Sequence, residues 1–205
     1  MAAQDGYRVG VIGATGAVGS TILKVLAERR FPAREVVALT SERSAGKTVA
    51  YNGSELRCVE LGDDTVGGID IAISSAGGAV SSEWAPKLVD AGAVVVDNTS
   101  YWRMHDDVPL VVSEVNPEAI ASHHGIIANP NCSTMQMVVA LAPIHRAVGI
   151  ERIVVSTYQS VSGTGRRAID ELFAQTRAVL DGEPVVAEVY RHQIAFNVLP
   201  QVESF

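Results

Sequence analysis

The chain has 205 residues, of which 47% are hydrophobic and 19% charged, and its formal net charge is −7 at pH 7. This apolar content suffices for a sizeable core, while the acidic balance and the lack of a basic stripe argue against nucleic acid as the main partner. Because no apolar run is long enough to span a membrane and no signal-peptide core stands near the N-terminus, we expect a cytoplasmic protein without a membrane partner.

The segment from Tyr7 to Gly19 reads YRVGVIGATGAVG and predicts a nucleotide-binding turn. An apolar run suited to a buried strand meets Gly13, Gly16 and Gly19, and an amphipathic helix is predicted from Ser20 to Arg30. Such glycines let the backbone approach a pyrophosphate, to which the helix N-terminus offers N–H donors. The spacing is GxxGxxG rather than GxGxxG, so a turn closed by glycine for packing alone is the alternative. The expected cofactor contacts in this turn are Gly13, Thr15, Gly16, Ala17 and Val18.

The second predicted strand, residues 36–39, is followed by a loop that favours NADP over NAD. In NAD-binding folds an acidic residue usually ends this strand, whereas a nearby arginine accommodates the 2′-phosphate of NADP. Here Arg43, with the hydroxyls of Ser41 and Ser44, suits a phosphate, although Glu42 stands beside the arginine. The alternative for Arg43 and Lys47 is a solvated surface loop.

Strand and helix patterns alternate along the rest of the chain, which predicts an α/β fold with a Rossmann-like parallel sheet and helices on both faces. Further strands are expected at 56–60, 69–74, 94–96, 126–128 and 153–158, and helices at 81–91, 135–148 and 166–180. Ligands of such sheets bind beyond the carboxyl ends of the strands. The turn after residue 74, formed by Ser75, Ala76 and Gly77, is therefore a second expected cofactor contact.

Cys132 is the strongest candidate for a catalytic residue. It stands in the sequence NPNCST (129–134), directly before an apolar, helix-forming run. Backbone N–H groups and the helix dipole favour the thiolate at such a position, and a thiolate is a nucleophile. The alternative is a small buried hydrophobe that begins a core helix. Cys58 lies in a short predicted strand and is expected to be structural. Two cysteines so far apart form neither a disulfide framework nor a metal motif, and no metal site is expected.

Five motifs together resemble, in order and over essentially the whole chain, those of the aspartate-β-semialdehyde dehydrogenases. They are GATGAVG (13–19), SERSAGK (41–47), DNTSYWRM (97–104), NPNCST (129–134) and QSVSGTG (159–165). NPNCST together with QSVSGTG is the most specific part. The resemblance implies NADP-dependent and phosphate-dependent interconversion of L-aspartate 4-semialdehyde and 4-aspartyl phosphate through a cysteine thioester. It also implies a role in lysine, threonine and methionine biosynthesis.

The resemblance further implies roles for individual residues and a domain organisation. Arg103 would clamp phosphate, since its guanidinium fork matches oxyanions, and Asn98 would donate a neutral hydrogen bond to the same anion. Gln159 would hold the substrate, Asn131 would contact substrate or phosphate, and Ser162 and Gly163 would contact the nicotinamide half of NADP. Without the resemblance, Arg103 could equally be a surface residue and Gln159 a strand-end residue. We expect an NADP-binding domain at 1–131 and part of an α+β catalytic and dimerisation domain at 132–205, in a homodimer.

The sequence departs from the family in one respect. Enzymes of this kind carry a histidine general base and a carboxylate-binding arginine downstream of QSVSGTG, and the sequence given stops at Phe205 before that region. None of its five histidines matches the family's catalytic one: His105, His123, His124, His145 and His192. We therefore expect the N-terminal part of a longer enzyme that binds NADP but turns over very poorly, since acid–base catalysis contributes about 10²–10⁴-fold in rate.

Two alternatives stay open. N-acetyl-γ-glutamyl-phosphate reductase shares the glycine turn and the thioester chemistry, but its cysteine motif has glycine where Asn131 stands here. A non-catalytic NADP-binding paralogue or fragment is the other alternative, against which the retained Cys132 argues. Glyceraldehyde-3-phosphate dehydrogenase shares the chemistry but not the motifs.

Overall fold

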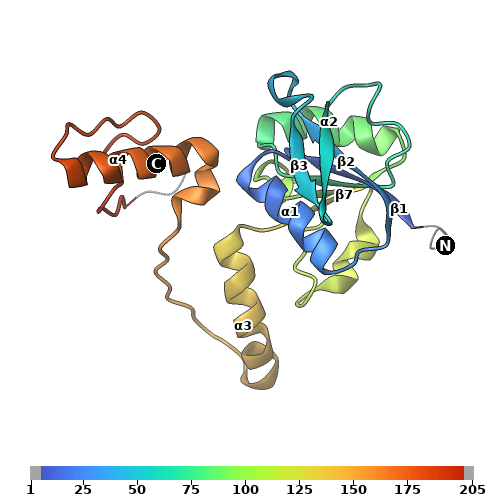
Figure 1. Cartoon of the computed structure of the whole chain (residues 1–205). Helices are drawn as coiled ribbons and strands as arrows, with labels where there is room; N and C mark the ends of the chain where they lie inside the picture. Colours follow the sequence, from blue (N-terminus) through green and yellow to red (C-terminus); the bar gives the residue numbers. More distant parts are fainter. Residues whose placement is uncertain (1–5, 201–205) are drawn as a thin grey trace. The chain divides into compact units, whose positions relative to one another are not determined.

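The computed structural model describes residues 6–200 (Figure 1). Its strands are β1 (Tyr7–Ile12), β2 (Ala33–Thr40), β3 (Thr48–Tyr51), β4 (Ser54–Glu60), β5 (Ile71–Ser74), β6 (Val94–Asp97) and β7 (Ile126–Ala128). Its α-helices are α1 (Ala17–Glu28), α2 (Gly78–Asp90), α3 (Cys132–Val148) and α4 (Arg166–Asp181). Short 3₁₀ helices are η1 (Glu42–Ser44), η2 (Tyr101–Met104), η3 (Pro117–Ser122) and η4 (Val161–Thr164). The chain forms two compact units, Met1–Ile153 and Val154–Phe205.

The first unit is built on a seven-stranded sheet in the order β3-β4-β2-β1-β5-β6-β7. Every neighbouring pair is parallel except β3 with β4. From β1 the chain moves outward to β2 on one side and later to β5 on the other. The strand order therefore reverses between β1 and β5, which is the point where open α/β sheets bind nucleotides. The predicted parallel sheet is confirmed.

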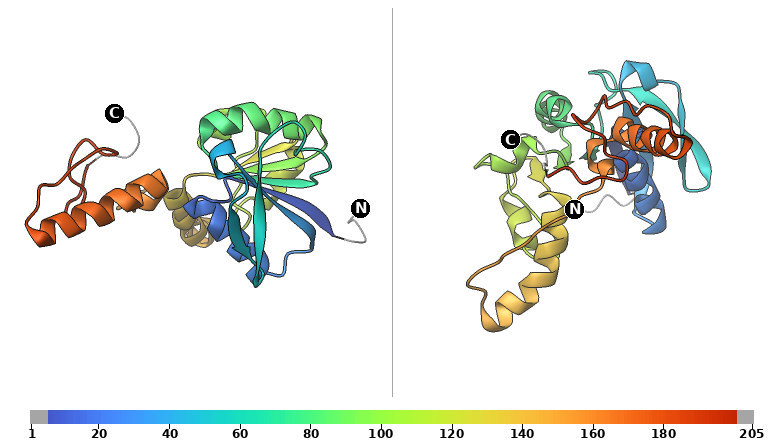
Figure 2. Two further views of the ribbon diagram at one scale, coloured as in Figure 1. Left: turned by 45° about the horizontal axis from the view of Figure 1, so that its top comes forward. Right: turned by 90° about the vertical axis from the view of Figure 1, so that its left-hand side faces the viewer.

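Alternating side chains of the strands form two cores, one on each face of this sheet. Val9 and Val11 of β1 belong to the core that contains Leu23 of α1. Ile12, at the end of the same strand, belongs to the core that contains Leu88 of α2. Leu23 and Leu88 are fully buried, and burying each such side chain contributes about 1.5–3 kcal/mol. Helices α1 and α2 thus cover opposite faces of the sheet (Figures 1 and 2), as predicted.

The prediction of a strand at residues 153–158 is wrong. The segment has no regular structure and is exposed throughout, with Val154 at 81% and Tyr158 at 85% relative exposure. Figure 2 draws it as an irregular trace. Its run of β-branched residues suits a strand, but a strand needs a neighbour for its N–H and C=O groups. No strand within residues 6–200 pairs with it.

The hairpin of β3 and β4 was not predicted, although its signal is present in the sequence. Asn52 and Gly53 connect the two strands with φ values of 48° and 78°. Positive φ at both central residues is what a two-residue hairpin turn requires, and Asn-Gly is its preferred pair. The hairpin adds an antiparallel edge to the parallel sheet and carries the chain from η1 back to β4.

The second unit consists of η4, α4 and a loop that α4 holds in place. Gln175 of α4 is buried, and its Oε1 accepts hydrogen bonds from the amides of Ile194 and Ala195 at 2.8 and 3.1 Å. α4 matches the predicted helix and ends at Gly182, which has a left-handed conformation. The chain divides into the two units between residues 153 and 154, so α3 belongs to the first. The domain boundary expected near Cys132 stays a prediction.

Candidate active site

Four neighbouring parallel strands end in one row, and a segment that carries candidate site residues follows each of them. Ile12 of β1 lies opposite Ser74 of β5, Ser74 opposite Asp97 of β6, and Asp97 opposite Ala128 of β7. The segments that begin immediately after these four residues start with Gly13, Ser75, Asn98 and Asn129. The site is therefore a line of loops along the carboxyl edge of the sheet, as the sequence predicted.

The glycine turn after β1 has the geometry of a pyrophosphate cradle. Gly13 has a φ of +81°, and a Cβ atom there would lie 3.2 Å from the Cα and Cβ atoms of Ala76. A Cβ atom on Gly19 would lie 2.7 Å from the carbonyl carbon of Gly13, inside the backbone of the turn. α1 begins at Ala17 with neither a side-chain cap nor an acidic residue in its first turn. Its first N–H groups therefore remain available to an anion, and the turn fits the phosphates of a dinucleotide.

The other predicted cofactor contacts belong to this turn or to the turn after β5. Gly16 is the N-cap residue of α1, and Thr15 and Val18 are exposed beside it. The turn after β5 packs directly against it, because both the amide and the hydroxyl of Ser75 donate to the carbonyl of Ile12 at 3.1 Å. Gly77, with a φ of +94°, then leads into α2. The structure brings the two predicted cofactor turns together at the point where the strand order reverses.

In NAD-binding folds an acidic residue near the end of the second strand binds the ribose hydroxyls. In this protein the end of β2 carries no carboxylate. The last residue is Thr40, a buried threonine whose hydroxyl donates to the carbonyl of Val59 at 3.3 Å. Arg43 of the following η1 is exposed and forms no ion pair within residues 6–200. Ser41, also exposed, is the N-cap residue of η1. The loop thus offers an exposed cation beyond the end of β2, where an arginine of NADP-binding folds accommodates the 2′-phosphate.

Ser44 differs from the other two residues of this loop. It is buried, and its hydroxyl accepts a hydrogen bond from the ammonium group of Lys47 at 3.4 Å. Its amide donates to the carbonyl of Ser41 at 2.8 Å. These contacts show that Ser44 shapes the loop from inside, and its predicted contact with the cofactor stays a prediction.

Arg103 of η2 is held between the loops that follow β6 and β7. Its Nε donates to the carbonyl of Asn129 at 2.9 Å, and Nη2 donates to the carbonyl of Asn98 at 3.3 Å. No carboxylate within residues 6–200 lies at ion-pair distance from this guanidinium. The two backbone contacts fix the side chain without neutralising its charge, so the remaining N–H groups can bind an anion such as phosphate.

Cys132 is the first residue of α3 and is exposed. The preceding residue, Asn131, caps the helix: its Oδ1 accepts hydrogen bonds from the amide and the hydroxyl of Ser133 at 3.0 and 2.7 Å. The thiol of Cys132 lies 3.7 Å from the same oxygen. This geometry excludes the alternative of a buried hydrophobe, because the sulfur is accessible and stands at the N-terminal end of a 17-residue helix. Cys58, in contrast, is buried in β4, and burial raises the pKa of its thiol despite the charge of Lys47.

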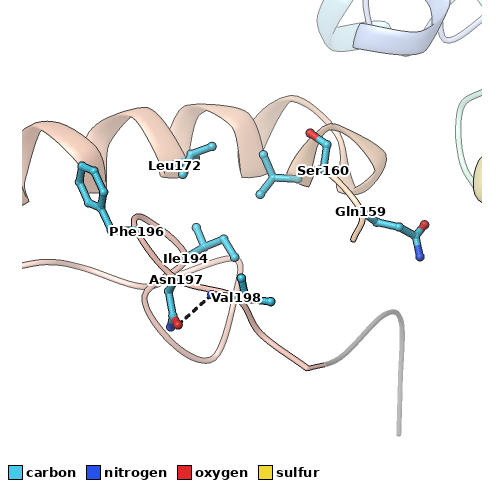
Figure 3. A pocket seen from close by; sticks show the side chains of 8 residues that line it. Gln159, Ser160, Leu172, Ile194, Phe196, Asn197 and Val198 are labelled. Carbon is cyan, nitrogen blue, oxygen red and sulfur yellow. Dashed lines mark hydrogen bonds between the residues drawn. The ribbon is translucent and has the colours of Figure 1, made fainter. Parts of the chain in front are cut away.

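The three predicted residues after position 158 lie in the second unit. Gln159 is exposed at the rim of an open hollow whose lining is mostly apolar, and Figure 3 shows its amide directed away from the other lining side chains. Ser162 and Gly163 lie in η4, which the hydroxyl of Ser160 caps. Thr164, at the end of η4, shares a hydrogen bond of 2.9 Å with the hydroxyl of Tyr190. These three residues and Cys132 belong to different units, and the roles of Gln159, Ser162 and Gly163 stay predictions.

Sequence reasoning missed a polar cluster that connects to η2, formed by the buried residues Ser81, Asp97 and Thr99 and the half-buried Trp102. A signal for it exists: an aspartate at a strand end with threonine two residues later is typical of a side-chain-capped turn. Within the part of the chain that the structure describes, no group of three or more His, Cys, Asp or Glu side chains could hold a metal ion. No helix of that part has the length and apolar character needed to span a membrane.

Known proteins resemble this chain in sequence and in fold. Residues 8–123 match the family described as semialdehyde dehydrogenase, NAD binding domain, and residues 141–205 match semialdehyde dehydrogenase, dimerisation domain. The chain is 55% identical over 204 residues to an aspartate-semialdehyde dehydrogenase of Aquifex aeolicus (strain VF5), covering 98% of this chain and 60% of that protein. It therefore spans about 60% of the length of the curated relatives it matches.

Two solved structures illustrate the similarity in fold. One is aspartate semialdehyde dehydrogenase II from Vibrio cholerae complexed with ASA, with a TM-score of 0.94 and 53% identity over 98% of this chain and 60% of that chain. The other is aspartate semialdehyde dehydrogenase with NADP from Candida albicans, with a TM-score of 0.57 and 29% identity over 70% of this chain and 48% of that chain.

Proposed function

Because the chain belongs to the semialdehyde dehydrogenase family and resembles its aspartate-semialdehyde dehydrogenases, as its motifs predicted, we propose that it carries the cofactor-binding and nucleophilic parts of that activity. The reaction is the reversible, phosphate-dependent oxidation of L-aspartate 4-semialdehyde to 4-aspartyl phosphate with NADP⁺. In the biosynthetic direction it supplies the aldehyde for the synthesis of lysine, threonine and methionine.

Cys132 and Arg103 account for the two bond-forming steps. The thiolate of Cys132, exposed at the start of α3, adds to the aldehyde carbonyl and forms a thiohemiacetal. NADP⁺, held by the glycine turn, would supply the hydride acceptor; the thiohemiacetal on Cys132 would lose its hydride to it and its hydroxyl proton to solvent, which would leave a thioester on Cys132. A phosphate ion held by Arg103 then attacks the thioester carbonyl, and the Cys132 thiolate leaves. The sulfur of Cys132 thus serves both as nucleophile and as leaving group.

The choice of NADP rests on the end of β2 and on the loop after it. A buried Thr40 replaces the carboxylate that would hold a free ribose hydroxyl, and the exposed Arg43 has no ionic partner within residues 6–200. The relative from Candida albicans was solved with NADP, which supports the same choice here. Glu42 would repel a 2′-phosphate, and we propose that Arg43 outweighs it because a guanidinium binds phosphate through paired, charge-assisted hydrogen bonds.

The single observation that carries the proposal is the row of strand ends that places the glycine turn, Arg103 and Cys132 along one edge of one sheet. Gln159, Ser162, Gly163 and Asn98 complete the proposed contacts with substrate, nicotinamide and phosphate. The match of residues 141–205 to a dimerisation domain supports a homodimer. We place the protein in the cytoplasm, where this biosynthesis would take place.

The test is a single-turnover experiment without phosphate. The chain is mixed with NADP⁺ and L-aspartate 4-semialdehyde, and NADPH formation is followed by absorbance while the protein is examined by peptide mass spectrometry. We expect up to one NADPH per chain and an aspartyl group on Cys132, both absent in Cys132→Ser. Cys58→Ser is the matched control and should behave as wild type, since Cys58 is buried. Acylation of Cys58, or NADPH formation by Cys132→Ser, would show that Cys132 is not the nucleophile.

A further inference from the structure

Asp97, the last residue of β6, is a fully buried acidic side chain that the reaction described above does not use. Its Oδ1 accepts hydrogen bonds from the amide and the hydroxyl of Thr99 at 2.9 and 2.6 Å, and its Oδ2 accepts one from the hydroxyl of Ser81 at 2.5 Å. No basic side chain within residues 6–200 forms an ion pair with it. A buried carboxyl group is costly unless hydrogen bonds compensate, and here its hydrogen bonds connect two segments of chain.

Both connections lead to η2, the 3₁₀ helix that carries Arg103. On one side, the hydroxyl of Ser81 accepts a hydrogen bond from the indole Nε1 of Trp102 at 2.9 Å. On the other, the hydroxyl of Thr99 accepts one from the amide of Tyr101 at 3.2 Å. Asp97 therefore holds the first two residues of η2 through two separate hydroxyl groups, and Arg103 is the next residue.

The backbone of Asp97 fixes the other side of the same site. Its carbonyl accepts a hydrogen bond from the amide of Asn129 at 2.8 Å, and the carbonyl of Asn129 in turn accepts from Nε of Arg103. Asp97 thus positions both the helix from which Arg103 projects and the loop that receives its guanidinium. Because a charge-assisted contact depends strongly on direction and distance, small displacements of either element would weaken binding of an anion.

We propose that Asp97 is a positioning residue for the anion site of Arg103 and acts through Ser81–Trp102 and through Thr99. The inference rests on the proposed function in one respect, namely that Arg103 binds phosphate. Because Ser81 belongs to α2, the same connection joins η2 to α2. Removing either hydroxyl should weaken phosphate binding while leaving the dinucleotide cradle, which α1 and the turn after β5 form, unchanged.

Trp102 provides a direct probe, because it precedes Arg103 and the chain contains only one other tryptophan, Trp84. In a Trp84→Phe background, inorganic phosphate is titrated against the fluorescence of Trp102, and NADPH affinity is measured in parallel. Ser81→Ala and Thr99→Val each remove one connection to Asp97, and the second keeps the side-chain volume. Ser82→Ala is the matched control, because among the described residues the hydroxyl of Ser82 donates to the carbonyl of Ala79, within α2, and to no residue of the Asp97 cluster.

We expect Ser81→Ala and Thr99→Val each to raise the phosphate Kd roughly tenfold, as for the loss of one buried hydrogen bond. Their NADPH affinity should equal that of wild type. Ser82→Ala should bind both phosphate and NADPH as wild type does. An unaltered phosphate Kd in both variants, with circular dichroism spectra matching wild type, would overturn the inference. So would an equal loss of NADPH affinity, because that would indicate a general disturbance of the sheet. Arg103→Ala distinguishes the phosphate site from the positioning role of Asp97. If Arg103→Ala leaves phosphate binding intact, the proposed phosphate site is wrong. If Arg103→Ala weakens phosphate binding but Ser81→Ala and Thr99→Val do not, the phosphate site stands and the positioning role of Asp97 is wrong.

Discussion

Replacing Asn131 tests how the beginning of α3 prepares Cys132 for reaction. The side chain of Asn131 accepts hydrogen bonds from the amide and the hydroxyl of Ser133, and Asn131→Ala removes both. Loss of such an N-cap costs about 1 kcal/mol of helix stability. We expect the first turn of α3 to fray, so that its amides no longer hold a fixed position at the helix end where Cys132 stands. At neutral pH we expect the alkylation rate of Cys132 to fall about fivefold, which corresponds to the same 1 kcal/mol.

Two further variants separate the cap from the charge. Asn131→Ser keeps a neutral cap and should react nearly as fast as wild type. Asn131→Asp also keeps the cap, but it places a negative charge where Oδ1 now lies 3.7 Å from the sulfur. Two like charges at about 4 Å repel by about 1 kcal/mol in water. Asn131→Asp should therefore retain a stable helix while the alkylation rate of Cys132 falls about fivefold, because the attacking sulfur anion meets this repulsion.

The assay is alkylation by iodoacetamide under pseudo-first-order conditions, with the modified peptides counted by mass spectrometry. Cys58 is an internal reference, because it is buried and should be labelled only after unfolding. Gln136→Ala, which changes an exposed residue of α3, is the control for substitution in the same helix. A wild-type rate in Asn131→Ala would refute the reasoning, as would an Asn131→Asp that reacts faster than Asn131→Ser.

Three other predictions follow from the fold and the cofactor site. Gly19→Ala places a Cβ atom inside the backbone of the glycine turn and should lower the free energy of unfolding, measured by urea denaturation, by at least about 2 kcal/mol. Gly62→Ala is the control and should leave it unchanged, because a Cβ atom at Gly62 would have no neighbouring atom within 4 Å. Arg43→Ala should raise the Kd of NADPH roughly tenfold and leave that of NADH unchanged in fluorescence titrations, since only NADPH carries the 2′-phosphate; an equal effect on both would remove Arg43 from the phosphate site. Burial raises the pKa of Glu171, but hydrogen bonds from the amides of Val189, Glu188 and Tyr190 and the charge of Arg167 outweigh it, so the net pKa is lowered. Its stabilising contribution is therefore present above the unfolded value of about 4.3 and lost as pH falls through the lower folded value; the stability difference between wild type and Glu171→Gln should vanish in acid and persist near neutrality.

Most of the first unit could be predicted because its signals are local. Buried parallel strands are continuous apolar runs, as in β1 and β2, and the glycines after β1 leave few alternatives to a tight turn. The helix at Cys132 was predicted from its apolar run, but its capping by Asn131 requires a side-chain rotamer that the sequence does not specify. The predicted resemblance to aspartate-semialdehyde dehydrogenases is confirmed by the family match and by the similarity in fold.

The errors arose where an element depends on residues far away in the chain. The run from Ile153 to Tyr158 has strand-forming residues but no partner strand within residues 6–200, so propensity alone misled. Asp97 was passed over because its partners, Ser81 on α2 and Thr99 after β6, meet only once α2 packs on the sheet.

The shared level at which β1, β5, β6 and β7 stop limits how this protein can change in length during evolution. Deleting one residue inside any of these strands would retract the following loop by about 3.3 Å and exchange the two faces of the strand's side chains. Insertions at the opposite edge of the sheet, in the connections that lead into the strands, have neither effect. Homologous sequences should therefore differ in length mainly at that amino-terminal edge, while the spacing within each strand and its following loop stays fixed.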